Sequence, residues 1–397
     1  MIQSHKTSLM RLVLQRKECE ELKRVDYWIL LFGRRKTGKT TLIKNCAKYD
    51  YFVTIANESE GLLEDGERIG IPELLREIRS EVRRGGRVVI DEFQRLPERF
   101  YADISTLDRT GGLVLAGSSY GVLNKVFDRN SPLLGLVTPR EIPILRYEEV
   151  LSQVGDPVLS TLFRDPWVIP FVNSYGEFLD RIREFSLISK GLVGEIFKEE
   201  ERSLTELYYQ SLLKVAEGVW KTSDLAGILQ VKGGEATVSS LMNRLSKMGL
   251  VRKIRTLGKE LYYRHVSPVI SLAFYAESKY LVSERDVKIP ELPIGLEVQF
   301  SVGEMISEYY GGDFVYSPRE DIDIIVMKGR RRLIAFEVKM GEISESEARE
   351  AVKRMSRVAE KVGLISLRER PPEMGDVSIG PKELLEISRE LVAKRRE

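Results

Sequence analysis

The sequence predicts an α/β protein built on a parallel β-sheet, followed by a helical segment and two smaller units. Short apolar runs alternate with helical patterns from Tyr27 to about Arg146, which is typical of a parallel sheet covered by helices on both faces. From about Glu148 to Lys198 the periodicity is helical, and after Ser203 groups of helices and strands follow one another. At 397 residues the chain is long enough for two or three domains.

Five apolar runs are the expected strands of the parallel sheet: residues 27–32, 51–56, 87–93, 112–119 and 141–147. The first run leads directly into GRRKTGKT, residues 33–40, and then into a helix-like stretch that begins at Thr41. A strand, a glycine-rich loop and a helix in this order predict a phosphate-binding loop. The backbone amides and the positive end of the helix dipole there converge on an anionic phosphate.

The loop pattern assigns roles to individual residues. Gly33 allows a sharp turn and Gly38 lets amide groups close round a phosphate, while Lys39 reaches the β and γ phosphates and Thr40 gives its hydroxyl to Mg²⁺. We therefore expect ATP and Mg as cofactors. The expected nucleotide-binding residues are Gly33, Arg34, Arg35, Lys36, Thr37, Gly38, Lys39, Thr40, Thr41 and Ser118.

An acidic pair completes the expected nucleotide site. Asp91 and Glu92 lie at the carboxyl end of the third apolar run, the edge at which open α/β sheets bind ligands. Asp91 is placed to hold Mg²⁺ through water, and Glu92 to polarise the attacking water. Ser118 and Ser119 end the next strand, where a polar group can sense the γ phosphate or, alternatively, cap a helix.

Residues 203–266 predict three short helices, over 203–218, 222–230 and 235–249, and then two strands joined around Gly258. This is the winged-helix arrangement, whose third helix can enter the major groove of DNA. An alternative is that the unit contacts a protein. The exposed candidates for DNA contact are Thr237, Ser240, Asn243, Arg244, Arg252, Lys253 and Arg255.

The last unit follows a proline-marked connector at residues 286–295. Its pattern predicts helices over 295–312 and 344–360 and strands over 321–329, 332–341 and 362–367. On the second of these strands Glu337 and Lys339 share one face, while their apolar neighbours share the other.

Composition limits the classes of partner. Lys and Arg number 62 against 60 Asp and Glu, so any contact with nucleic acid must come from local patches. The two cysteines, Cys19 and Cys46, and the two histidines, His5 and His265, are too few and too scattered for a structural zinc site or a disulfide framework. Because no apolar run approaches the roughly 18 residues of a membrane span, and the N-terminus lacks a signal-peptide core, we expect a cytoplasmic protein without a membrane partner.

Together these motifs resemble the archaeal ATPase family of the AAA-type superclass. In that family a P-loop domain is followed by a winged helix and a domain with the PD-(D/E)xK nuclease fold. The resemblance covers nearly the whole chain and implies ATP hydrolysis, with Lys39 and Glu92 as catalytic residues and DNA as a partner. It rests on GRRKTGKT, VVIDEFQRLP, LVLAGSS, SPLLGLVTPREIPIL, EDIDIIV and FEVKMG.

The same resemblance implies a second catalytic site. A nuclease of this fold needs an acid on one strand, an acid and a lysine two residues apart on the next, and often a glutamate on the preceding helix. Asp323, Glu337, Lys339 and Glu304 fit that order. Asp323 and Glu337 would hold Mg²⁺, and Lys339 would orient the attacking water. The alternative is a docking or DNA-binding module whose acids are idle.

The chain departs from the family pattern at two points. Leu136 stands where the family usually has an arginine after the glycine of the SPLxG segment, which leaves Arg129 and Arg140 as the nearest substitutes for a transition-state arginine. The glycine-tyrosine-proline element of the lid reads Ser-Tyr-Gly at residues 174–176. The sequence therefore does not identify the arginine that contacts the nucleotide.

Three functions stay open on the sequence. The first is an ATP-hydrolysing protein that acts on DNA through a Mg-dependent nuclease-like domain. The second is a nucleotide-dependent switch that only binds DNA or a protein partner, and the third is ATP-driven remodelling of a protein; self-association is also open. The expected boundaries are 1–147 for the P-loop core, 148–202 for a helical lid, 203–285 for the winged helix and 286–397 for the nuclease-like domain.

Overall fold

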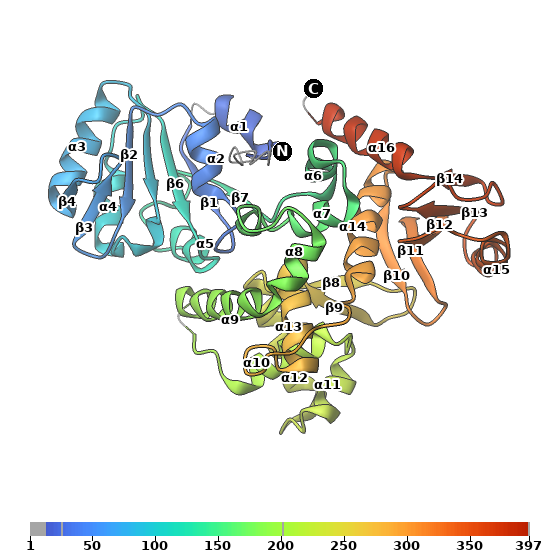
Figure 1. Cartoon of the computed structure of the whole chain (residues 1–397). Helices are drawn as coiled ribbons and strands as arrows, with labels where there is room; N and C mark the ends of the chain where they lie inside the picture. Colours follow the sequence, from blue (N-terminus) through green and yellow to red (C-terminus); the bar gives the residue numbers. More distant parts are fainter. Residues whose placement is uncertain (1–12, 25–26, 201, 396–397) are drawn as a thin grey trace, which may run out of the picture.

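A computed structural model describes residues 13–24, 27–200 and 202–395 of the chain. Figure 1 shows an N-terminal sheet with its helices, a central group of helices and a C-terminal sheet on the opposite side. The first twelve residues of the expected P-loop core, His5 among them, lie outside the described residues. None of the helices in the described ranges combines the length and apolar character that a membrane span requires.

The N-terminal sheet has seven strands in the order β4-β3-β2-β5-β6-β1-β7. Strands β2, β5, β6, β1 and β7 run parallel to one another, whereas β3 pairs antiparallel with both β2 and β4 at one edge, so the sheet is mixed rather than wholly parallel. The strands are β1 (Ile29–Phe32), β2 (Tyr51–Ile55), β3 (Glu60–Leu63), β4 (Arg68–Gly70), β5 (Val88–Asp91), β6 (Leu113–Gly117) and β7 (Thr138–Glu141).

The prediction of a last strand at residues 141–147 is wrong. Strand β7 comes earlier, and the apolar residues after it lead into the central helices. All four residues of β7 are exposed, because β7 is an edge strand, and so they lack the apolar run by which a buried strand is found in a sequence.

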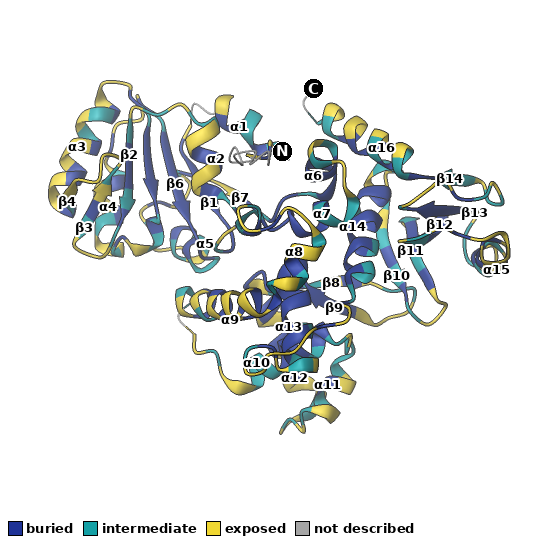
Figure 2. Ribbon diagram, viewed as in Figure 1, coloured by how far each residue is buried: buried dark blue, intermediate teal, exposed yellow. Residues whose placement is uncertain are grey.

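Both faces of the central parallel strands β1, β5 and β6 are buried, as Figure 2 shows. In β1, Leu30 and Phe32 pack into one core, while Ile29 and Leu31 pack into another on the opposite face. This double burial explains the continuous apolar runs of the sequence. The first core is covered by α3 (Ile71–Arg83), α4 (Tyr101–Ser105) and α5 (Gly121–Val126), and the second by α1 (Glu18–Arg24) and α2 (Lys39–Cys46).

A disulfide joins Cys19 of α1 to Cys46 at the end of α2, with the two Cα atoms 5.1 Å apart. The sequence analysis, which expected no disulfide framework, did not foresee this bond, because it forms only when α1 and α2 lie side by side on the same face of the sheet. The disulfide fixes α1 against the helix that follows the phosphate-binding loop.

The central helices share a hydrophobic core with the C-terminal sheet. Val150, Phe178 and Phe185 belong to the same cluster as Val298 and Phe336. The segment expected to be a lid is therefore packed mainly on the C-terminal half of the chain. Its helices are α6 (Tyr147–Val154), α7 (Pro157–Leu162), α8 (Tyr175–Asp180) and α9 (Ile182–Glu199), and a short 3-10 turn at Pro166–Val168 lies between α7 and α8. Two further 3-10 turns, Phe93–Arg95 and Glu98–Phe100, follow β5 in the N-terminal part.

Three helices and a β-hairpin follow, in the order that the sequence predicts. They are α10 (Glu206–Ala216), α11 (Thr222–Ile228), α12 (Gly234–Lys247), β8 (Val251–Arg255) and β9 (Leu261–His265). Helix α13 (Pro268–Tyr280), which the sequence analysis did not identify, packs along α9 and α10.

The C-terminal sheet also has seven strands, in the order β14-β13-β12-β11-β10-β8-β9. The hairpin β8–β9 thus extends this sheet, since β8 pairs with β10 through Arg255 and Val315. The elements after α13 are α14 (Ile294–Tyr309), β10 (Asp313–Ser317), β11 (Ile322–Lys328), β12 (Arg331–Lys339), α15 (Glu345–Met355), β13 (Lys361–Ser366), β14 (Val377–Ile379) and α16 (Pro381–Lys394).

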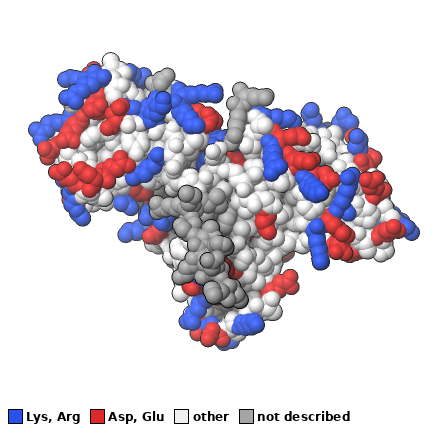
Figure 3. Space-filling model, turned by 45° about the horizontal axis from the view of Figure 1, so that its top comes forward, with Lys and Arg blue, Asp and Glu red and all other residues white. Residues whose placement is uncertain are grey.

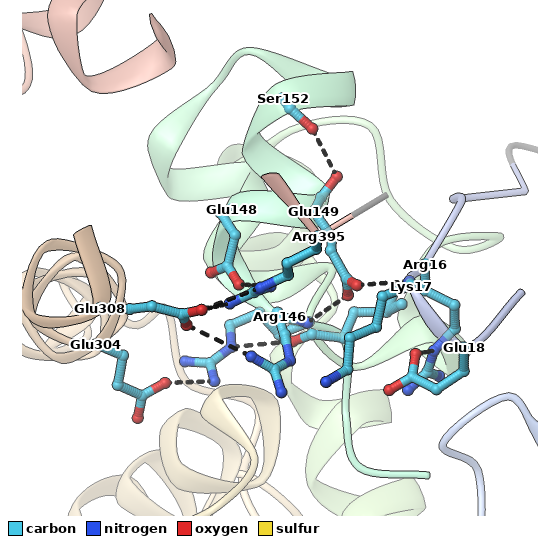
Figure 4. A network of polar contacts seen from close by, with 12 residues as sticks. Arg16, Lys17, Glu18, Arg146, Glu148, Glu149, Ser152, Glu304, Glu308 and Arg395 are labelled. Atoms are coloured by element: carbon cyan, nitrogen blue, oxygen red, sulfur yellow. Dashed lines mark hydrogen bonds and ion pairs between the residues drawn. The ribbon is translucent and has the colours of Figure 1, made fainter. Parts of the chain in front are cut away.

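A polar network connects the N-terminal segment, α6 and the C-terminal helices (Figure 4). The backbone amide of Lys17 donates to Glu149 of α6 over 2.8 Å. The neighbouring Glu148 pairs with Arg395, which also pairs with Glu308 of α14. These contacts hold α6 between the start of the chain and the C-terminal unit.

Reducing the disulfide is expected to lower the stability of the N-terminal sheet and its helices. The two cysteines are 27 residues apart, and closing a loop of about that length in the unfolded chain corresponds to about 3 kcal/mol. Thermal unfolding with and without a reductant measures the change. A Cys46→Ser variant in oxidising buffer should match the reduced wild type and should not respond to the reductant. Equal melting temperatures for oxidised and reduced wild type would contradict the prediction.

Candidate functional site

The loop from Gly33 to Gly38 connects β1 to α2 as the sequence predicts. Both glycines have positive φ angles, 147° and 88°. A Cβ on Gly33 would lie 2.5 Å from the carbonyl oxygen of Ile142. Position 33 therefore requires glycine for two reasons. Its backbone conformation is unfavourable for other residues, and the chain segment that follows β7 comes too close to leave room for a side chain.

Lys39 is the first residue of α2 and is only 6% exposed. Its Nζ donates to the carbonyl oxygens of Gly33 and Arg34, over 3.0 and 2.9 Å. Burial lowers the pKa of Lys39 to about 8, against the opposing effect of the carboxylates of Glu92, Asp91 and Glu199. The ammonium group thus lies inside the loop and close to three carboxylates.

Thr40 and Asp91 lie side by side at the edge of the sheet. The Thr40 hydroxyl donates to Asp91 Oδ2 over 2.6 Å. Burial raises the pKa of Asp91, although the hydrogen bond from Thr40 opposes this shift. A hydroxyl and a carboxylate side by side fit Mg²⁺, which usually takes one or two protein oxygens and fills its remaining positions with water and phosphate.

Glu92 is held by two neutral donors. Ser118 Oγ donates to its Oε1 over 3.0 Å and Gln94 Nε2 to its Oε2 over 2.7 Å. The backbone of Glu92 is left-handed, with φ 53°, which costs energy for a non-glycine residue and is common at functional sites. Gln94, in the 3-10 turn that follows β5, was not expected from the sequence, because only the turn brings it back to Glu92.

Arg34 forms a buried ion pair with the central helices. Its Nη2 lies 2.7 Å from Asp165 Oδ1, and the two side chains are 2% and 0% exposed. Asp165 Oδ2 also accepts a hydrogen bond of 2.5 Å from Ser267, the N-cap of α13. Within the described part of the chain, Nε and Nη1 of Arg34 have no hydrogen-bond partner. The loop is therefore tied to the central helices and to α13 through one carboxylate.

Arg35 points toward α9. Its guanidinium lies 2.6 Å from Glu199, 2.8 Å from Glu195 and 3.9 Å from Glu92. Glu200, which follows Glu199, contacts the residues after β6. Its Oε1 accepts hydrogen bonds from Ser119 Oγ over 3.0 Å and from the Tyr120 amide over 2.6 Å. The end of α9 thus lies beside the loop and the end of β6, a placement that no sequence pattern indicated.

The other expected binding residues lie on the loop or the first turn of α2. Lys36 and Thr41 are exposed, whereas Thr37 is buried and its carbonyl accepts from Arg16 over 3.0 Å. The two substitute arginines are not at the loop. Arg140 of β7 pairs with Glu21 of α1 over 2.9 Å, and Arg129 lines a shallow hollow with residues of α5.

The C-terminal sheet brings Asp323 and Glu337 together. They face each other on β11 and β12, next to the paired residues Ile324 and Phe336. Asp323 Oδ2 accepts the Val338 amide over 2.8 Å. Burial and the charge of Glu337 raise the pKa of Asp323 to about 7. Two neighbouring carboxylates fit a Mg²⁺ site that water and substrate complete.

Basic groups already neutralise Glu337. Arg354 of α15 lies 2.6 Å from Glu337 Oε2, and Lys339 lies 3.6 Å from its Oε1. Glu304 is placed elsewhere, because it pairs with Arg164 over 2.7 Å and with Arg252. In the described ranges no group of three or more His, Cys, Asp or Glu side chains is arranged to hold a metal ion.

The expected DNA-facing residues divide into two groups. Thr237, Ser240, Asn243 and Arg244 are exposed on α12. The basic residues of the hairpin have acidic or polar partners: Arg252 pairs with Glu304, Arg255 with Asp313, and Lys253 with Asn243. Figure 3 shows basic and acidic side chains interspersed on the face that it presents.

Comparison with known proteins identifies the class of the N-terminal part. Residues 25–151 match the family model described as "AAA domain". The match includes the loop, Asp91, Glu92 and Ser118, and together with the strand order it defines an AAA-type P-loop domain within this chain. No curated protein sequence matches the chain.

Among solved structures, the chain is similar to archaeal ORC and Cdc6 proteins. The ORC2 protein of Aeropyrum pernix, solved in ADPNP and ADP complexes, is 14% identical over 67% of this chain and 95% of that one, with a TM-score of 0.39. The ORC1 protein of the same organism, solved in complex with DNA, is 13% identical over 69% and 95%, with a TM-score of 0.31. Cdc6p of Pyrobaculum aerophilum is 15% identical over 66% and 90%, with a TM-score of 0.24.

Replacing Asp165 by Asn is expected to destabilise the protein by about 3 kcal/mol or more, because Arg34 would keep a buried, uncompensated charge. Ser267→Ala is the matched control. It removes the cap on α13 and the Ser267 hydrogen bond to Asp165 but keeps the ion pair, so it should cost about 1–2 kcal/mol. Denaturant unfolding measures both changes. An Asp165→Asn variant no less stable than Ser267→Ala would show that the ion pair does not hold the loop.

Proposed function

We propose that this chain binds ATP with Mg²⁺ and hydrolyses it. The observation that carries the proposal is the position of three groups at one edge of the sheet: the buried Lys39, the Thr40–Asp91 pair, and a Glu92 held by Ser118 and Gln94. Lys39 contacts the terminal phosphates, and Thr40 and Asp91 hold the metal ion. Mg²⁺ would offset charge on the phosphate oxygens.

Hydrolysis on these residues needs one proton acceptor. The oxygen of water forms a bond to the terminal phosphorus, and the bond from that phosphorus to the bridging oxygen breaks, so ADP leaves with the electron pair. Glu92 orients the water and takes its proton. Ser118 and Gln94 fix the carboxylate of Glu92, so we assign them positioning roles.

Lys39→Ala is expected to abolish nucleotide binding, and Glu92→Gln is expected to keep binding but lower the hydrolysis rate by on the order of a hundredfold or more. Release of inorganic phosphate and titration with a fluorescent nucleotide measure the two effects. Lys44→Ala, an exposed lysine further along α2, serves as the control and should keep the wild-type rate. A Lys39→Ala variant that hydrolyses ATP at the wild-type rate would disprove the assignment.

We also propose a role for the parts that follow. Residues 148–202 form a lid, 203–285 a winged helix and 286–397 a nuclease-like domain that acts on DNA. The helix-strand order from α14 to β13 and the approach of Asp323 to Glu337 favour this second function. The pairing of Glu304 with Arg164 and Arg252 does not, so Asp323, Glu337 and Lys339 are the residues that we assign to cleavage.

At this second site Mg²⁺ would be held by Asp323 and Glu337 and would polarise a phosphodiester oxygen. The oxygen of water forms a bond to the backbone phosphorus and gives up a proton to solvent. The bond from that phosphorus to one sugar oxygen breaks, and the sugar oxygen leaves with the electron pair and takes up a proton from solvent, so no net proton is consumed. Lys339 orients the water. The alternative is a binding module in which Arg354 permanently neutralises Glu337.

Glu337→Ala and Lys339→Ala are each expected to abolish Mg-dependent nicking of supercoiled DNA, while Glu350→Ala, an exposed acid on α15, keeps it. Salt-dependent DNA binding is measured alongside. Nicking that survives both substitutions would exclude this site as a nuclease. Salt-sensitive binding without any nicking would support the switch interpretation, and the absence of DNA binding would favour a protein partner.

A further inference from the structure

We propose that Arg35 is the arginine that contacts the terminal phosphate of the bound nucleotide, and that Glu195 and Glu199 of α9 hold it when no nucleotide is present. The inference rests on the ATPase function proposed above. It supplies the arginine that the sequence did not identify, and it gives α9 a role in sensing the nucleotide.

The position of Arg35 supports this role. It is the third residue of the phosphate-binding loop, and its guanidinium lies 3.9 Å from Glu92, the residue assigned to the attacking water. Glu199, its 2.6 Å partner, also acts electrostatically on Lys39. Arg35, Lys39 and Glu92 therefore belong to one cluster of charges, centred on the place where the terminal phosphate is expected.

The partners of Arg35 are acids that a nucleotide would replace. Glu199 has a side chain that is 14% exposed, and its Oε2 has no hydrogen-bond partner within the described part of the chain. A terminal phosphate carries more charge than a carboxylate and binds the planar guanidinium through two oxygens. A triphosphate on the loop would therefore compete for Arg35 and repel Glu199 at the same time. ADP, which lacks the terminal phosphate, would compete less.

Arg95 is the other arginine near Glu92, at 3.5 Å. Its Nη1 also reaches the carbonyl oxygens of Ile55 and Ala56 at the end of β2, over 3.4 Å. Arg95 is not part of the phosphate-binding loop, and no acid of α9 is among its partners in the described ranges. It therefore serves as the comparison residue.

The loss of the ion pairs between Arg35 and α9 would affect the rest of the chain through α9. The second half of this helix, from Leu192 to Phe197, packs in one core with α10, α12 and α13. Loss of the two ion pairs would free the end of α9 from the phosphate-binding loop. The nucleotide state would then change how the three-helix unit is held against the AAA domain.

The experiment measures the affinity of the full chain for ADP and for a non-hydrolysable ATP analogue. Arg35→Ala should weaken binding of the analogue about tenfold or more relative to ADP and lower kcat by on the order of a hundredfold. Glu199→Gln should tighten binding of the analogue about threefold or more, because a competing charge is removed. Such a gain in affinity cannot come from misfolding. Glu200→Gln and Arg95→Ala are the matched controls, and neither should change the preference for the triphosphate.

Three results would overturn the inference. If Lys39→Ala loses nucleotide but Arg35→Ala keeps the wild-type preference and kcat, the assignment of Arg35 is wrong and the ATPase proposal stands. If Arg95→Ala, rather than Arg35→Ala, loses the preference for the triphosphate, Arg95 is the phosphate-contacting arginine. If the wild-type chain binds neither nucleotide, the ATPase proposal and this inference both fail.

Discussion

The buried ion pair between Arg34 and Asp165 is the constraint on which the arrangement of the candidate nucleotide site depends. Both side chains are almost fully buried, so each charge is stable only while the other is in place. Asp165 also accepts from Ser267 at the start of α13. The loop, the central helices and the helix after the hairpin therefore meet at a single carboxylate, although they lie far apart in the sequence.

A second set of ion pairs at the same loop differs in its exposure. The side chains of Arg35 and Glu195 are 24% and 54% exposed, so exchanging their partners costs far less than breaking the buried pair. Arg34 therefore fixes the loop on the central helices, whereas the contacts of Arg35 are the ones that we propose a nucleotide exchanges. One loop thus contains a permanent contact and an exchangeable one, side by side.

The sequence was a good guide wherever local chemistry determines the structure. The run from β1 through GRRKTGKT to α2 was predicted from the residues themselves, because glycine conformations and apolar runs are local properties. The pairing of Cys19 with Cys46 and the partners of Glu304 could not be predicted, because each depends on which distant elements pack together. The exposed strand β7 and the short strand β10 were missed since neither has a strong apolar pattern. The hydrogen bond from Gln94 to Glu92 could not be predicted either, because it forms only when the 3-10 turn after β5 folds the Gln94 side chain against the Glu92 carboxylate.

The hydrophobic cores indicate how a structural change at the nucleotide site would be transmitted to the C-terminal sheet. The central helices α6 to α9 and strands β11 to β13 share one hydrophobic cluster. Glu304 adds ion pairs from α14 to Arg164 after α7 and to Arg252 in the hairpin. These parts should move together, since separating them would expose that shared core to water. The AAA domain has its own two cores on either side of its sheet. The contacts of Arg34 and Arg35 lie at the junction between these two bodies. Under the proposed mechanism, a change of partner at Arg35 would therefore act on the central helices and the C-terminal sheet together, while the contact between Arg34 and Asp165 stays in place.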